Sequence, residues 1–438
     1  MDRFIRGIFW IAGYLLLVSV PLLILFVERT PPGRGFAPDF NVALAFSATA
    51  MMGMMFFLTA RSRSIGNSIG IDIIYYYHRR IALAAYVFVL IHILIALFVN
   101  RAFAADIINS TLPLGIRFGV VALLLLTVLV ISSVWRKQLR IPYEIWRLWH
   151  IILAISVISF SLMHIFSVAY YAGSSNELFL WCSLALFWFA TTVWTRLIKP
   201  LLRRRHPYEV VEIRAEAGNA WTLALKPLGH GGIRFKPGQF AWLTIGQSLF
   251  TLDEHPFSIS SSACEHERVE FTIKELGDFT SEISNITPGV TAYVDGPHGS
   301  FSTDQHDAPQ YFFFVGGIGI TPVMSILRTM ADRLDQRQLL LIYGCKTLED
   351  MTFREELKTL SGQLNLTIVE VPEHPPDGWS GESGFIDDKI LRRYLPDYRS
   401  GAKYFLCGPG PMKTAIEIGL HRQRVPLENI YTELFDFV

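Results

Sequence analysis

Two stretches of equal length decide how this chain folds: HRRIALAAYVFVLIH at residues 78–92 and HIILAISVISFSLMH at residues 150–164. Each begins and ends with histidine and is apolar over most of its length. Fourteen residues of α-helix rise about 21 Å and complete nearly four turns, so both histidines of a stretch face the same side. The pattern predicts two membrane-crossing helices that each present imidazoles at two depths of a bilayer roughly 30 Å thick.

Histidines at two matched depths suggest two metal centres. No other histidine precedes His206, and ionisable groups inside membrane spans are costly and usually functional. Ligands of one iron cannot lie about 21 Å apart, so each pair must join the two helices. The third and fifth of the expected spans cross the membrane in the same direction, which pairs His78 with His150 and His92 with His164. Two nitrogen ligands for each iron leave no open coordination position, which favours electron transfer. The sequence therefore predicts two stacked haem b groups; the alternative is four unrelated polar residues.

The first 200 residues read as a six-span membrane domain. With 438 residues, 51% of them hydrophobic, the chain is too apolar to be wholly soluble and too long for one domain. The first apolar run, Ile8 to Val27, has no small-residue cleavage site and is interpreted as a span. Spans of about the 20 residues that a bilayer requires are expected near residues 7–27, 41–60, 80–99, 115–134, 146–168 and 177–198.

Loop charges give an orientation. Alternate loops and the segments at both ends of the domain carry fifteen Lys and Arg residues, and the other side carries only Arg29, Arg34, Arg101 and Arg117. The positive-inside rule therefore places both termini in the cytoplasm. On that basis His78 and His150 form an inner pair near the cytoplasmic face, and His92 and His164 form an outer pair.

Aromatic and basic residues border the expected inner pair. Tyr75, Tyr76, Tyr77, Trp146 and Trp149 suit the interfacial belt of a membrane protein. The alternative is a role beside the inner haem. Arg79, Arg80 and Arg147 would either pair with haem propionates or follow the charge rule.

The rest of the chain is predicted to hold two soluble domains. Residues 206–302 contain short alternating strands broken by Gly and Pro, which predict an antiparallel β-barrel that ends at VDGPHGSF, residues 294–301. Residues 305–438 open with YFFFVGGIGITPVMSILRTM, residues 311–330: a buried strand, a glycine-rich turn and a helix. Further apolar strands follow at 339–345, 366–371 and 403–409, so we expect a doubly wound α/β nucleotide-binding domain.

The turn at residues 316–322, GGIGITP, has a physical purpose. Glycines let backbone amides approach a pyrophosphate, and the helix N-terminus that follows favours its negative charge. A tight turn made only for packing is the alternative.

A formal net charge of +1 gives no reason to expect nucleic-acid binding. Four scattered cysteines without a CxxC motif indicate neither a disulfide framework nor a zinc site.

Three motifs in the soluble half carry a family resemblance. HPFSI at residues 255–259 resembles the flavin motif of the ferredoxin–NADP reductase family. GGIGITP at 316–322 and CGPGPM at 407–412 resemble that family's two nicotinamide-nucleotide motifs. Behind a six-span bis-haem domain, they make the chain, from about residue 5 onward, similar to the NADPH oxidase and ferric reductase superfamily, particularly its compact bacterial members.

The resemblance implies an FAD site in the barrel domain. The segment lining FAD would be His255, Pro256, Phe257, Ser258 and Ile259, with Ser258 near the flavin N5 edge and His255 near the phosphates or ribose. Thr272 and Lys274 lie on the neighbouring strand and could touch the flavin or ribityl region. Gly277 and Thr280 fall where the family contacts the pyrophosphate, although GDFT could equally be an ordinary turn.

The resemblance also implies an NADPH site, with NADH possible. Its residues would be Gly316, Gly317, Gly319, Thr321, Pro322, Gly408, Pro409 and Met412. Cys407 would bring its thiol near the nicotinamide C4, and a structural buried cysteine is the alternative. Lys346 lies where relatives place a basic group for the ribose or its 2′-phosphate. Phe435, or its rival Phe437, would cover the flavin ring until nicotinamide displaces it.

The function that the resemblance implies is electron transfer from NADPH through FAD and the inner and outer haems to an acceptor. Short outer loops without a chelating cluster favour oxygen, giving superoxide; a ferric chelate is the alternative. Against direct transfer of the oxygen chemistry, Ala96 stands where animal oxidases carry a histidine, with Arg101 as a candidate substitute. The expected location is the plasma membrane, the inner membrane of a bacterium.

Other function classes predict different behaviour. A membrane subunit that delivers electrons to a periplasmic partner protein would turn over NADPH slowly until the partner is added. A non-redox transporter with a sensor domain would show no haem absorbance. The chain has no EF-hand loop and no regulatory extension, so we expect constitutive activity, membrane lipid around the spans and no regulatory partner.

Overall fold

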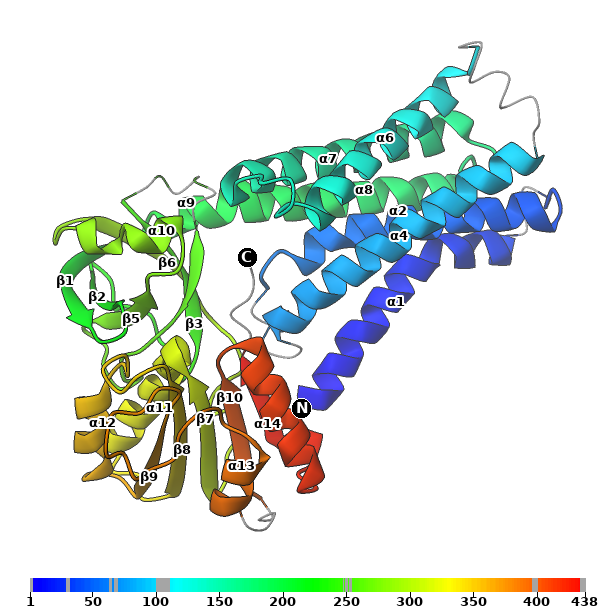
Figure 1. The fold of residues 1–438 in the computed structure, drawn as a ribbon. Coiled ribbons are helices and arrows are strands. Elements are labelled where there is room, and N and C mark those ends of the chain that lie inside the picture. The colour runs from blue at the N-terminus through cyan, green and yellow to red at the C-terminus, as the bar shows by residue number, and fades with distance from the viewer. Residues whose placement is uncertain are drawn as a thin grey trace. The chain divides into compact units, whose positions relative to one another are not determined.

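The N-terminal half consists of long apolar helices. The computed structural model describes residues 3–28, 32–62, 65–66, 70–99, 111–246, 248, 251, 254–395 and 401–433. The chain divides into two units, Met1–Pro200 and Leu201–Phe437, and each unit is described by itself. The long helices of the first unit (Figure 1) are α1 (Arg3–Glu28), α2 (Phe36–Leu58), α4 (Ile71–Val99), α6 (Leu114–Val134), α7 (Tyr143–Val168) and α8 (Ser175–Val193).

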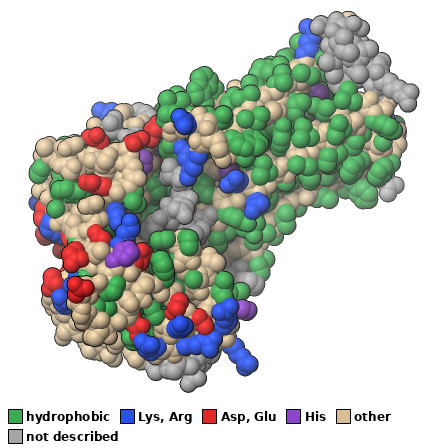
Figure 2. Space-filling view, viewed as in Figure 1, with side chains coloured by type: hydrophobic (Ala, Val, Ile, Leu, Met, Phe, Trp, Pro, Cys, Tyr) green, Lys and Arg blue, Asp and Glu red, His purple; other side chains and the backbone are tan. Residues whose placement is uncertain are grey.

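All six of these helices are long and apolar enough to cross a membrane. Figure 2 shows hydrophobic side chains over most of their visible surface, as expected where lipid replaces water. The six-span prediction is therefore confirmed, although its bounds shift. The third helix begins at Ile71, nine residues before the predicted start, and α2 begins at Phe36. Helical hydrogen bonds continue through the polar turn around His78, because they are satisfied within the segment itself.

Neighbouring helices pack in pairs, α2 with α4 and α6 with α7, and α8 lies against α2. A Cβ atom added to Gly53 of α2 would lie 2.2 Å from Cε2 of Trp188 in α8, so this approach requires glycine. Phe46 and Trp181 meet edge to face with ring centroids 5.0 Å apart. After α8 the helix continues as one π-helical turn, η1 (Trp194–Ile198), and then α9 (Lys199–Arg203).

The first domain of the second unit is an antiparallel sheet that curls on itself. Its strands are β1 (Tyr208–Glu216), β2 (Ala220–Pro227), β3 (Phe240–Ile245), β4 (His255–Ser258), β5 (Val269–Lys274) and β6 (Thr291–His298). They lie in the order β4-β3-β6-β1-β2-β5. A bridge between Ile259 and Phe271 joins the two ends of the sheet. The short elements α10 (Asp278–Ser281) and η2 (Ile283–Asn285) follow β5. The predicted antiparallel barrel is confirmed.

The second domain is a five-stranded parallel sheet. Its strands are β7 (Gln310–Gly316), β8 (Gln338–Cys345), β9 (Leu366–Pro372), β10 (Lys403–Cys407) and β11 (Ile430–Glu433), and its helices are α11 (Ile320–Asp332), α12 (Arg354–Ser361), α13 (Asp388–Tyr394) and α14 (Gly410–Arg422), with η3 (Gly317–Gly319) and η4 (Leu427–Asn429). The strand order is β11-β10-β7-β8-β9. The order in which successive strands are added therefore reverses between β7 and β10, the switch point where such sheets bind ligands.

Apolar cores cover both faces of this sheet. α11 and α12 pack on one face against Tyr311, Phe313 and Val315, and α13 and α14 pack on the other against Phe312 and Phe314 (Figure 1). Every residue of β7 is buried, which explains its continuous apolar run. The predicted doubly wound fold is confirmed.

Ion pairs connect elements of the second unit. Arg328 of α11 binds Glu356 of α12 at 2.6 Å and donates to the Ser260 carbonyl of the barrel at 2.8 Å. Arg203, at the end of α9, pairs with Glu254 at 2.8 Å and with Asp295 at 2.6 Å. Arg203 is one of the basic residues that predict the orientation of the membrane domain. Its two ion pairs also hold the end of α9 against the barrel.

Candidate functional site

The four predicted metal-binding histidines form two cross-helix pairs. His78 and His92 lie on α4, and His150 and His164 lie on α7. The ring centroids of His78 and His150 are 6.2 Å apart, and those of His92 and His164 are 6.4 Å apart. The folded chain therefore brings together the same partners that the equal spacing predicts.

These separations suit one metal ion between each pair of rings. With ring bonds close to the peptide C–N length of about 1.33 Å, each imidazole atom lies roughly 1.1 Å from the ring centroid. A metal–nitrogen bond of about 2.0–2.1 Å on either side then gives roughly 6.3 Å between centroids. Among the described residues, no group of three or more His, Cys, Asp or Glu side chains could hold a metal ion. The ring separations of the two pairs fit ligation by two imidazoles, as a bis-histidine haem would need.

The second ring nitrogens of the outer pair face backbone carbonyls. Nδ1 of His92 lies 3.0 Å from the Asn41 carbonyl oxygen of α2, and Nδ1 of His164 lies 2.8 Å from the Gly115 carbonyl oxygen of α6. A carbonyl only accepts, so both Nδ1 atoms carry the proton. The Nε2 lone pair of each ring stays available for a metal, as in ligating histidines generally.

Close helix packing makes the contact with Gly115 possible. A Cβ atom added to Gly119 would lie 3.0 Å from Nδ1 of His164, and one added to Gly115 would lie 2.7 Å from Cβ of Ser167. Neither glycine is among the site residues predicted from the sequence. The GxxxG spacing of residues 115–119 in an apolar helix, a known sign of close helix contact, was the available signal.

The inner pair has different neighbours. Nδ1 of His150 lies 3.2 Å from Oγ of Ser133, and Nε1 of Trp146 lies 3.4 Å from the same oxygen. The Trp146 ring is 5.0 Å from the His150 ring. Nδ1 of His78 has no hydrogen-bond partner among the described residues. Trp146 therefore lies beside the inner pair. Arg147 is buried, whereas Arg79 and Arg80 are exposed.

The predicted flavin segment forms β4 and contains an unsatisfied hydroxyl. Ser258 is 4% exposed, and its Oγ has no hydrogen-bond partner in the part of the chain that the structure describes. Because a buried polar atom without a partner is costly, a bound group with a polar edge would relieve this cost. The His255 ring stacks on the Phe279 ring with centroids 4.1 Å apart. The Phe257 ring also stacks on Phe279, with centroids 6.0 Å apart. These features fit a flavin.

Other predicted flavin contacts are engaged within the protein. The Thr272 hydroxyl lies 3.0 Å from Oγ of Ser260 and 2.9 Å from Oγ1 of Thr222. Lys274 is partly exposed at the end of β5. The Thr280 hydroxyl accepts from the Gly277 amide at 2.9 Å and donates to the Gly277 carbonyl at 3.0 Å. The GDFT turn closes on itself in this way, and its contact with pyrophosphate stays a prediction.

The two predicted nicotinamide motifs lie against each other at the switch point. A Cβ atom added to Gly319 would lie 2.2 Å from the Cys407 carbonyl oxygen. One added to Gly316 would lie 2.8 Å from Sδ of Met412, and one added to Gly408 would lie 2.9 Å from the Gly316 amide nitrogen. Close backbone approach therefore explains these glycines.

Side chains hold the glycine-rich turn from both sides. The buried Tyr343 of β8 donates to the Gly317 carbonyl at 3.0 Å. The Thr321 hydroxyl donates its one proton to the Ile318 carbonyl at 2.9 Å, and its oxygen also lies 3.4 Å from the Thr272 carbonyl oxygen of the barrel. Pro322 is buried in the first turn of α11. These contacts link the turn to the flavin domain.

Cys407 is fully buried at the end of β10, beside Val315 and Glu433 in the sheet. Burial raises the pKa of its thiol well above the ordinary value, so the sulfur stays protonated near neutral pH. Pro409 immediately precedes α14. Lys346 is exposed just after β8. Phe435 and Phe437 lie outside the described residues.

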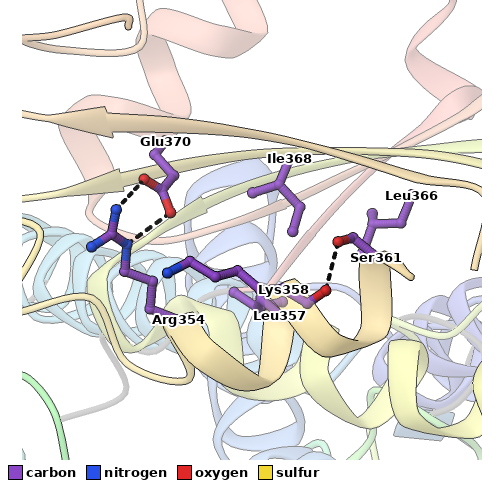
Figure 3. Close-up of a pocket in the computed structure, with 7 residues that line it drawn as sticks. All are labelled: Arg354, Leu357, Lys358, Ser361, Leu366, Ile368 and Glu370. Carbon is purple, nitrogen blue, oxygen red and sulfur yellow. Dashed lines mark hydrogen bonds and ion pairs between the residues drawn. The ribbon is translucent and has the colours of Figure 1, made fainter. Parts of the chain in front are cut away.

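A shallow depression between α12 and β9 is separate from these sites (Figure 3). It is lined by Arg354, Leu357, Lys358, Ser361, Leu366, Ile368 and Glu370. Arg354 binds both carboxylate oxygens of Glu370, at 2.9 and 2.8 Å. No residue predicted from the sequence as a site residue is among those that line it.

Three domain families match the chain in succession. The family described as ferric reductase like transmembrane component matches residues 44–161. The FAD-binding domain family matches residues 206–302, and the oxidoreductase NAD-binding domain family matches residues 313–417. All three families belong to oxidoreductases.

Individual relatives cover part of the chain. The reductase component of propane 2-monooxygenase from Rhodococcus jostii is 32% identical over 49% of this chain, which spans 59% of that protein. NADH-cytochrome b5 reductase 1 from Laccaria bicolor is 30% identical over 39% of this chain, which spans 58% of that protein. The structure of flavohemoglobin from Malassezia yamatoensis, with bound FAD and heme, superposes with a TM-score of 0.51 at 16% sequence identity. The match covers 91% of this chain and 97% of the flavohemoglobin chain, and at this identity it shows a likeness of fold alone.

Proposed function

We propose, from the architecture of this chain, that it transfers electrons from NADPH across the membrane to an acceptor on the far side. The chain has the architecture of NADPH oxidases and ferric reductases: a ferric reductase-like transmembrane domain is followed by an FAD-binding domain and an NAD-binding domain. The two cross-helix histidine pairs carry this proposal, because their ring separations of 6.2 and 6.4 Å suit bis-imidazole ligation at two depths.

Cofactors supply the redox chemistry: FAD would accept a hydride and release single electrons, and two haems would relay them across the membrane. The protein supplies ligands, orientation and shielding. His78 and His150 would hold the inner haem, and His92 and His164 the outer one. Backbone carbonyls fix the tautomer of both outer ligands.

In the soluble unit, each motif has a separate role. Ser258 offers a buried, unsatisfied hydroxyl to the flavin edge. The glycine-rich turn of residues 316–319 leads directly into α11, whose N-terminus would favour the negative charge of a pyrophosphate. Cys407 has a neutral thiol at the end of β10, which would add no charge beside a nicotinamide. Phe435 is proposed to cover the flavin when nicotinamide is absent.

Dioxygen is the proposed acceptor, reduced by one electron to superoxide. The segments expected on the outer side carry no cluster of His, Cys, Asp or Glu in sequence that would bind a ferric chelate. We place both termini in the cytoplasm of a cell whose plasma membrane, or bacterial inner membrane, holds the six helices. A ferric chelate or a periplasmic partner protein is the alternative acceptor.

The proposal can be tested on the purified protein in detergent, loaded with haem and FAD. Addition of NADPH under argon should reduce both haems, and admission of air should give a dismutase-sensitive superoxide signal. His164→Ala should lose one haem and nearly all of the superoxide signal. His206→Ala, which changes a histidine of the soluble unit, is the matched control and should keep both.

Each alternative has its own result. Reduced haems that reoxidise with ferric citrate but yield no superoxide would identify a ferric reductase. Slow NADPH turnover with every small acceptor would favour delivery to a partner protein. A preparation without haem absorbance after loading would overturn the electron-transfer proposal.

A further inference from the structure

The four histidines differ in what their second nitrogen contacts. In the outer pair, both Nδ1–H groups donate to backbone carbonyls, at 3.0 Å for His92 and 2.8 Å for His164. In the inner pair, His150 contacts a serine hydroxyl at 3.2 Å, and Nδ1 of His78 has no partner among the described residues. The two otherwise similar sites therefore have unequal hydrogen-bond acceptors.

The Ser133 hydroxyl has a fully assigned set of bonds. It donates its only proton to the Leu129 carbonyl at 2.7 Å, as a serine within a helix often does. A hydroxyl has one donor and two acceptor positions, so it accepts from Nδ1–H of His150 and from Nε1–H of Trp146. His150 thus has the same tautomer as the outer histidines.

Ser133 is nevertheless a weaker acceptor than a carbonyl in this setting. Its oxygen is shared between two donors, and its distance to His150 exceeds both outer distances by at least 0.2 Å. A strong acceptor at Nδ1 makes the imidazole a more basic ligand, and a more basic ligand stabilises the oxidised metal. A weaker acceptor has the opposite effect.

We propose that Ser133 and Trp146 are positioning residues that keep the reduction potential of the inner haem site above that of the outer site. Ser133 orients His150, and Trp146 limits how strongly Ser133 accepts from it. The outer site, with two carbonyl acceptors, is then the stronger reductant. This inference rests on the proposed function and deepens it, because a strongly reducing outer site suits an acceptor such as dioxygen, which takes its first electron reluctantly.

Two substitutions should move the inner potential in opposite directions. Ser133→Ala removes the acceptor of His150, so the inner potential should rise by 59 mV or more, a tenfold change in the ratio of reduced to oxidised haem for one electron. Trp146→Phe keeps an aromatic ring beside His150 but removes the competing donor, so the inner potential should fall. A purely structural loosening would shift both variants in the same direction.

Ser132→Ala is the matched control. Ser132 is the neighbouring serine of α6, and its hydroxyl donates to the same Leu129 carbonyl at 3.1 Å, without a bond to histidine. This variant should keep both potentials of the parent protein. The potentials are measured by optical titration of the haem-loaded, full-length protein with chemical mediators, in the absence of NADPH and of any acceptor.

The titration separates the two proposals. Failure to load two haems would contradict the proposed function itself. Two haems with equal potentials, or an upper potential that Ser133→Ala does not raise, would overturn the inference and leave the proposed function standing. If Ser133→Ala does not load haem, Trp146→Phe alone decides: a fall of the upper potential supports the inference, and a rise or no change overturns it.

Discussion

The membrane unit and the soluble unit build their candidate sites in opposite ways. In the membrane unit, large side chains are placed at a helical spacing, and neighbouring helices supply the acceptors for His92, His164 and His150. In the soluble unit, side chains are removed: Gly316, Gly319 and Gly408 let two motifs meet at backbone distance.

The difference suits the chemistry of the group that each unit is proposed to bind. A metal needs ligands with lone pairs, which only side chains such as imidazole supply in a helix whose backbone bonds are used internally. A pyrophosphate needs several amides at close range, which Cβ atoms would obstruct. Substitutions should therefore damage the two units by different routes.

The largest expected effect is at Gly319. In Gly319→Ala, the new methyl group would lie 2.2 Å from the Cys407 carbonyl oxygen, and relieving such overpacking costs about 1–3 kcal/mol. We expect KM for NADPH to rise at least tenfold while the haem spectrum stays unchanged. Gly410→Ala, in the second motif but with open space around its Cβ position, is the control. Equal KM values for the two variants would contradict the close-approach argument.

A smaller effect is expected at Gly119 in the membrane unit. Its added Cβ would lie 3.0 Å from Nδ1 of His164, so the ring must shift by a few tenths of an ångström and weaken its bond to Gly115. Gly119→Ala should lose outer haem on mild heating before the parent protein does, with KM for NADPH unchanged. Gly13→Ala, which meets nothing within 4 Å, should behave like the parent. Haem retention is followed by absorbance after gel filtration.

Arg328 tests whether the soluble site depends on the junction of its two domains. Arg328→Gln removes the pairs with Glu356 and Glu270, at 2.6 and 3.2 Å, from a side chain only 14% exposed. We expect a loss of about 1–3 kcal/mol, seen as earlier release of FAD fluorescence on heating. Lys358→Gln, which breaks the exposed pair with Glu355, should change stability by less than about 1 kcal/mol. If Arg328→Gln and Lys358→Gln released FAD at the same temperature, the junction of the two domains would have no role in holding the flavin.

The pH response of Cys407 is the mildest test. Burial raises the pKa of its thiol, so the thiolate that reacts with iodoacetamide stays scarce as pH rises from 7 to 9, whereas a small free thiol with pKa of about 8.5 becomes reactive. Mass spectrometry of the alkylated peptide should show Cys407 unmodified across this range while added glutathione reacts faster. Rapid alkylation of Cys407 at pH 9 would contradict its burial and its neutral state.

The sequence predicted the elements better than their limits. The six spans, the antiparallel barrel and the parallel sheet are all present, but α4 begins at Ile71 rather than near residue 80. Hydropathy marks the apolar core of a helix, whereas helical hydrogen bonding continues into polar turns. The family resemblance placed Thr280 at a pyrophosphate contact, and the structure shows its hydroxyl bonded within the turn. Its contact with a ligand stays a prediction.

What the sequence alone determined is what a single segment encodes. The spacing of His78 from His92 and of His150 from His164 needs only the geometry of one helix, and the order of the flavin and nicotinamide motifs needs only the chain. The tertiary structure decided which atoms these residues meet. Asn41 and His92 are 51 positions apart, and Gly115 and His164 are 49 apart. Such partners are selected by how helices pack, because the contact depends on the register of two surfaces and on neither segment alone.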